Sequence, residues 1–512
     1  MERNNVLKNT VMLTASGIIA KTVDFIFRTY YSKQLGREGT GLLSLVFTAH
    51  SIMLTLAAAG ISVAISKVIA SCIARRDMSL AYRSMKAALS CTLFSSVLVI
   101  AAVFLLSGYI SEDILKDSRT RISLLFLSPS ILFMGLSYCY KGYFYSVRKI
   151  LIPASSEFVE QLVKISVIST LLSLWLPKGA EYGCRAVFLG LSIGEASSFL
   201  YLSAFYFAEV KRYAQKRIIH KRDKTPVLVP LLKIALPALL SSLSGSYLHM
   251  KEELLIVSGL KKHGLSPSGA LSAYGTVSGM ILPLTMFPLS LISSFLTLLV
   301  PEISRAAARA DKTRLLDLAG KVYKFAAVGA FLIMTVFFSA PSEIVEAAYS
   351  LEDAGGFVMI FATLLPVFLC DSVSHGILNG LGKQATLLVI TLSECILRIF
   401  ICFVFVPKLG VSAIILTVYA GNLFSVASKL LCVLVKTGLR FNVFEWVIFP
   451  FCLTLTTAFI SGKIFICPAF INTALAVKIL TAAGLYIILS FVFGFLKRDE
   501  ICWIKSRLLS GK

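Results

Sequence analysis

Long apolar runs dominate the 512-residue chain, and short polar segments separate them. A helix of about 20 apolar residues is long enough to cross a bilayer. Runs of that length predict an all-α polytopic membrane protein with about fourteen transmembrane helices. The expected spans are residues 10–32, 40–65, 86–109, 121–145, 153–176, 184–207, 228–258, 270–300, 320–340, 357–381, 384–406, 411–435, 443–466 and 473–496.

An internal repeat groups twelve of these spans into two lobes of six. A shift of 234 residues superposes the fourth and fifth spans on the tenth and eleventh. The superposed residues are Lys141 on His375, Glu160 on Glu394, and Lys164 on Arg398. Because six is an even number, both lobes enter from the same side, and we expect a pseudo-two-fold axis along the membrane normal. The predicted parts are an N-lobe (1–208), a basic linker (209–227), a C-lobe (228–436), two further spans (437–498) and a tail (499–512).

Composition and charge exclude a soluble protein and argue against a nucleic-acid-binding one. Hydrophobic residues make up 57% of the chain and charged residues only 15%, whereas soluble domains carry about 25% charge. The net charge of +23 comes mainly from Lys and Arg in the connections. These residues are roughly three times more frequent on one side of the predicted spans, which places both termini in the cytoplasm.

Three charged residues lie inside the first span. Lys21, Asp24 and Arg28 follow an i, i+3, i+7 spacing, so a helix places them on one face. A Lys or Arg at mid-bilayer costs roughly 2.5 to 3.5 kcal/mol. We interpret the stripe as part of a polar cavity that binds an anionic ligand. The alternative is that Asp24 neutralises Lys21 and Arg28 within the helix.

The seventh span carries a second charged cluster, formed by Lys251, Glu252 and Glu253. An acid here is a candidate gate partner for Arg28, or a proton or cation site that couples transport. The alternative is that the cluster lies nearer the outer interface and is simply hydrated.

Two more candidates for gating or ion coupling are acid-to-base pairs four residues apart. Glu160 and Lys164 lie in the fifth span, and Glu394 and Arg398 lie in the eleventh. This order of charges is the favourable one on a helix, so structural pairing inside the bundle is the alternative explanation.

Metal-binding motifs are absent from the sequence. The eleven cysteines form no CxxC pair, and HExxH does not occur. The one GxSxG match, at residues 190–194, lies inside the predicted span 184–207 and not at a strand-to-helix turn. We therefore predict a protein that is not an enzyme, with no cofactor and no metal. Transport would then draw on an ion gradient of H⁺ or Na⁺, the membrane potential or the substrate gradient.

The first two spans resemble a known family. The segments SGIIAKTVDFIFRTYYSKQLGREGTGLLSL and AAAGISVAISKVIA are similar to the opening of the polysaccharide-transporter branch of the multidrug/oligosaccharidyl-lipid/polysaccharide (MOP) exporter superfamily. Within that branch the chain most resembles the stage V sporulation protein B group, which is related to the MurJ-type lipid II flippases.

The resemblance implies alternating access between two six-helix lobes in the bacterial cytoplasmic membrane. It also implies that an undecaprenyl-pyrophosphate-linked glycan, such as a lipid II-like peptidoglycan precursor for cell wall or spore cortex, crosses from the inner to the outer leaflet. In MurJ-type relatives basic residues of the first span face the central cavity, and Lys21 and Arg28 occupy the matching positions. The further cavity arginines of those relatives, in the second span and around the eighth, have no clear match.

The chemistry of such a substrate agrees with the charged stripe. Arg28 offers a bidentate contact to phosphate and Lys21 a point charge. The expected partners are the lipid-linked glycan and membrane lipids. Two alternatives remain open. The first is a multidrug exporter, although the surplus positive charge disfavours binding of organic cations. The second is a non-transporting scaffold for envelope assembly.

Overall fold

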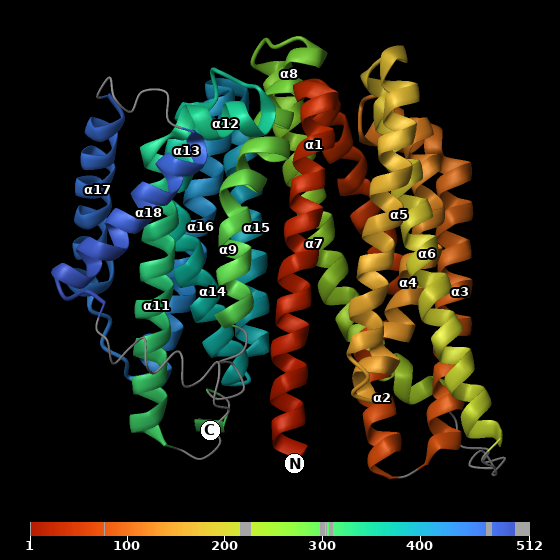
Figure 1. Ribbon diagram of the computed structural model, residues 1–512. Helices are drawn as coiled ribbons and strands as arrows, with labels where there is room; N and C mark the ends of the chain where they lie inside the picture. The colour runs from red at the N-terminus through yellow and green to blue at the C-terminus, as the bar shows by residue number, and fades with distance from the viewer. Residues whose placement is uncertain are drawn as a thin grey trace. The chain divides into compact units, whose positions relative to one another are not determined.

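The computed structural model is built from helices throughout the part of the chain that it describes (Figure 1). The described residues are 2–75, 77–215, 227–296, 303, 305–306, 311–466 and 474–496. Most of the predicted linker and the whole predicted tail lie outside these ranges. The helices divide into two compact units at Gly275.

The first unit extends from Ala15 to Gly275. Its elements are α1 (Glu2–Ala58), α2 (Ile61–Ala74), α3 (Met78–Tyr109), η1 (Ile110–Ile114), α4 (Thr120–Ser146), α5 (Leu151–Trp175), η2 (Leu176–Lys178), α6 (Ala180–Gln215), α7 (Leu228–Lys262) and α8 (Pro267–Tyr274). The first turns of α1 are grouped with the second unit.

The second unit contains the helices that follow Gly275. Its elements are η3 (Gly275–Ile281), α9 (Leu282–Leu296), α11 (Lys312–Ser339), α12 (Pro341–Tyr349), α13 (Gly355–Ala362), α14 (Leu365–Gly380), α15 (Gln384–Leu409), α16 (Val411–Thr437), η5 (Phe444–Ile448), α17 (Phe449–Ile466) and α18 (Leu475–Val492).

Among the described residues, 12 helices are long and apolar enough to cross a membrane, or 13 if the bent pair α13 and α14 counts as one span. One of them, Ser16–Ala74, has 59 residues. At 1.5 Å per residue it would be about 88 Å long, nearly three times the hydrocarbon thickness. Gly36 breaks its helical geometry, with φ 70° and ψ −174°. The first two predicted spans fall on either side of Gly36, which explains why the sequence count is higher.

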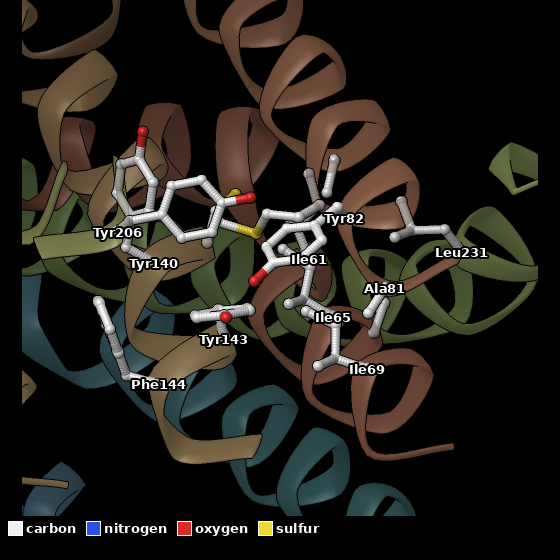
Figure 2. Close-up of a cluster of buried hydrophobic side chains, with 14 of the residues drawn as sticks. Ile61, Ile65, Ile69, Ala81, Tyr82, Tyr140, Tyr143, Phe144, Tyr206 and Leu231 are labelled. Atoms are coloured by element: carbon white, nitrogen blue, oxygen red, sulfur yellow. The ribbon is translucent and has the colours of Figure 1, made fainter. Parts of the chain in front are cut away.

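The first unit has a core of buried aromatic side chains (Figure 2). Tyr82 of α3, Tyr143 of α4 and Tyr206 of α6 lie together, and the rings of Tyr143 and Tyr206 meet edge to face at 5.0 Å. Large aromatic rings bury much area, so this cluster ties the three helices together. Leu231 and Ala235 bring α7 into the same cluster.

Helix α7 also packs against the turn between α1 and α2, and α8 packs against α1. A Cβ atom on Gly60 would lie 2.4 Å from the carbonyl oxygen of Ala235, and one on Gly41 would lie 2.2 Å from that of Leu271 in α8. Small residues permit such close contacts between helix backbones in membrane proteins. Helices α7 and α8 therefore group with α1 to α6, while the lobe boundary at the linker stays a prediction.

In the second unit α11 is central, because it contacts α9, α14, α17 and α18. The helix ends follow the predicted repeat: α14 ends 234 residues after α4, and α15 ends 234 residues after α5. This agreement supports the repeat, and the symmetry axis stays a prediction.

Candidate functional site

The charged stripe of the first span lies on an unbroken part of α1. Residues 16–35 are helical, so Lys21, Asp24 and Arg28 share one side as predicted. Lys21 is exposed, and Arg28 is partly exposed. The buried side of the helix is formed by Ala20, Phe27 and Tyr31.

Asp24 forms an ion pair with another helix. Its Oδ1 lies 2.6 Å from Nζ of Lys164 in α5, and Nε2 of Gln161 donates a hydrogen bond to the same oxygen at 3.2 Å. A cation of α5 therefore takes part in neutralising Asp24. Arg28 is close enough to act on the Asp24 carboxylate electrostatically, and among the described residues it makes no ion pair of its own.

The predicted pair of Glu160 and Lys164 is also arranged differently, because Lys164 contacts Asp24. Glu160 instead lies within hydrogen-bonding range of Glu195 in α6. Lys141 of α4 completes the cluster through an ion pair with Glu157, with Nζ and Oε1 3.3 Å apart. Three helices thus place acids and bases side by side in the interior of the first unit.

Glu195 was missed in the sequence. It is an acid inside the predicted sixth span, which is the signal that could have found it. The 234-residue shift places it on Lys429, a buried charged residue.

The acids of α7 contact neighbouring helices. Glu253 accepts a hydrogen bond from the hydroxyl of Thr48 in α1 and interacts electrostatically with Tyr274 in α8. Glu252 is buried, with its Oε2 3.8 Å from Nδ1 of His249. The structure therefore places Glu253 against Thr48, and not in an ion pair with Arg28.

Lys251 lies on a different side of α7 from the buried Glu252. It is exposed, and its ammonium nitrogen lies 5.5 Å from the ring centre of Tyr247, one turn earlier. This distance allows a cation–π contact. Lys251 is thus separated from the acids with which the sequence grouped it.

In the second unit, the predicted pair of Glu394 and Arg398 forms within α15, with Oε1 and Nη2 3.0 Å apart. A second ion pair was not predicted. Lys429 of α16 lies 2.8 Å from Oδ2 of Asp371 in α14, and Ser425 also donates to this carboxylate. The side chain of Lys429 is buried inside the helix bundle.

Among the described residues, no group of three or more His, Cys, Asp or Glu is placed to hold a metal ion. Several charged side chains in each unit instead form ion pairs with one another. The arrangement is suited to binding charged groups and protons.

Comparisons with known proteins identify the family of the chain. A family model described as "Polysaccharide biosynthesis protein" matches residues 6–307, more than half of the chain. The chain is 23% identical over 510 residues to "Stage V sporulation protein B" of Bacillus subtilis (strain 168), with 98% of each chain covered.

Two solved structures are similar in fold. "Lipid II flippase MurJ, inward closed conformation" has a TM-score of 0.67 at 14% identity. The superposition covers 94% of this chain and 98% of the MurJ chain. The structure described as an inward-facing conformation of a multidrug resistance MATE family transporter of the MOP superfamily has a TM-score of 0.65 at 14% identity. The superposition covers 84% of this chain and 98% of the MATE chain. The family predicted from the first two spans is confirmed: the chain belongs to the polysaccharide biosynthesis protein family, and it shares the fold of these MurJ and MATE structures.

Proposed function

We propose that this protein is an alternating-access flippase with both termini in the cytoplasm. Its substrate is a lipid II-like peptidoglycan precursor, or a related glycan, linked through pyrophosphate to undecaprenol. The polar head crosses the membrane through the protein, while the lipid tail remains in the bilayer.

The observation that carries the proposal is the positive charge around α1. Lys21 and Arg28 lie on one side of a membrane-length helix, and the ammonium of Lys164 offsets the charge of Asp24. On α1 itself, two cations and one carboxylate leave one positive charge, because Lys164 belongs to the interior cluster with Glu160 and Glu195. A surplus of this sign favours a pyrophosphate group and disfavours the organic cations of a multidrug exporter.

Energy for transport comes from a coupling ion in this proposal. Glu160 and Glu195 lie within hydrogen-bonding range of each other, and two adjacent carboxylates repel unless a proton or a cation lies between them. We place H⁺ or Na⁺ at this pair. Glu253, with its hydrogen bond to Thr48, and the Glu394–Arg398 pair are candidate gating contacts.

The test is complementation of a bacterial cell depleted of its lipid II flippase. Wild type, Arg28→Ala and Lys67→Ala are compared at matched membrane abundance. Lys67 is an exposed lysine of α2 and serves as the control for the loss of one positive charge. We expect wild type and Lys67→Ala to rescue growth and Arg28→Ala to fail.

Three other outcomes would count against the proposal. Rescue by Arg28→Ala would remove Arg28 as a substrate contact. Failure of wild type, with folded protein in the membrane, would point to another lipid-linked glycan or to drug export. Rescue by every charge variant along α1 would show that transport does not depend on these charges.

A further inference from the structure

We propose that Lys164 is a positioning residue that keeps Arg28 available to the substrate. The ammonium of Lys164 forms an ion pair with the carboxylate of Asp24. This pair prevents the carboxylate from pairing with Arg28. The inference rests on the proposed function, since it explains how a helix that carries its own carboxylate still binds an anionic head group.

The contact between α1 and α5 supports this role. Nζ of Lys164 and Oδ1 of Asp24 are 2.6 Å apart, and Gln161, one turn earlier on α5, donates to the same oxygen. The Lys164 side chain is only 8% exposed, whereas the Asp24 side chain is 51% exposed. The lysine is therefore fixed in the interior, and the carboxylate at the accessible edge is held toward it.

Packing around Lys164 limits its movement. A Cβ atom on Gly194 of α6 would lie 3.1 Å from Cβ of Lys164, so α6 closely covers the base of the side chain. Glu160 and Glu195 also act on its ammonium electrostatically. Lys164 is thus held among carboxyl groups of α1, α5 and α6, and its charge serves this interior cluster and not the substrate directly.

Without Lys164, Asp24 has an obvious alternative partner. Arg28 follows Asp24 by four residues, the favourable acid-to-base order on a helix. An Asp24–Arg28 pair would occupy the guanidinium that we assign to the pyrophosphate. The internal carboxylate would then compete with the substrate for the same donors.

The test measures binding of undecaprenyl pyrophosphate to the purified full-length protein in detergent. We expect Lys164→Gln to weaken binding about tenfold, the scale of one charge-assisted hydrogen bond. The double variant Asp24→Asn/Lys164→Gln should return to near the wild-type affinity, because it has no carboxylate to compete. Lys178→Gln, at an exposed lysine beyond the end of α5, is the matched control.

Thermal unfolding of each variant separates positioning from folding. If Lys164→Gln does not fold, binding is measured with the double variant, in which both charges of the pair have been removed. Wild-type affinity in Lys164→Gln, or weak binding by the folded double variant, would overturn the inference. If wild type itself does not bind the pyrophosphate lipid, the proposed function fails instead, so the two failures are distinguishable.

Discussion

The hydroxyl oxygens of Thr55 and Ser246 lie 3.1 Å apart and connect the second half of α1 to α7. Thr48 and Glu253 form another hydrogen bond between the same helices. The two contacts are seven residues apart on each helix, in opposite directions. Helices α1 and α7 are therefore antiparallel and in a fixed register.

This register predicts a cross-link. In a protein whose eleven cysteines have been replaced, T55C combined with S246C should form a disulfide under mild oxidation, because the two side chains already meet. Gel mobility after cleavage of the loop between α6 and α7 reports the bond. T55C with S244C is the control, since Ser244 is exposed and donates to Leu240 of its own helix. Equal cross-linking of both pairs would contradict the register.

The close contact of α1 with α8 predicts that Gly41→Ala destabilises the protein. The added methyl group would meet the carbonyl oxygen of Leu271 at 2.2 Å, and a backbone atom cannot move aside easily. We expect a loss of about 1 to 3 kcal/mol, typical of overpacking, measured as a lower thermal unfolding midpoint in detergent. Gly17→Ala on the same helix meets nothing within 4 Å and should not lower the midpoint.

The buried pair of Asp371 and Lys429 predicts a large effect of removing one partner. Asp371→Ala leaves an uncompensated ammonium inside the second unit, at a cost of about 3 to 5 kcal/mol. Asp371→Ala/Lys429→Ala should recover part of this loss in the same unfolding measurement. Asp317→Ala removes a more exposed pair with Lys321 and should cost no more than about 1 kcal/mol. Equal losses for Asp371→Ala and Asp317→Ala would contradict the prediction.

Arg119, between η1 and α4, donates to both oxygens of Asp117 and to Glu38. Hydrogen bonding to Asp117 raises the pKa of Arg119 above its ordinary value. Because the pKa is raised, charged Arg119 contributes its full stabilisation at every pH below the ordinary arginine pKa of about 12.5, and loses it only above that pH. We therefore expect Arg119→Lys, which cannot form the same fork, to lower the unfolding midpoint equally at about pH 6 and pH 9. A difference that changes between these two pH values would disprove this explanation.

Much of the fold follows from the sequence. Apolar runs of bilayer length predicted the helices, and the segment from Ser16 to Leu45 predicted the family. The 234-residue shift agreed with the ends of α4 and α14, and of α5 and α15. These features are local or repeated along the chain, so a single sequence contains them.

The partners of the buried charges could not be predicted in the same way. Lys164 and Glu160 are four residues apart in the sequence, yet Lys164 pairs with Asp24, 140 residues away. Glu394 and Arg398 have the same spacing and do pair within their helix. Spacing shows only which residues share a helix face.

The sequence by itself determined that this is a helical membrane protein with charges inside its first helix. Only the tertiary structure decided which carboxylate meets which cation, and so how much positive charge remains near Arg28. The physical reason is that hydropathy acts along each segment, whereas an ion pair forms only where the packing of separate helices brings the two groups within a few ångströms.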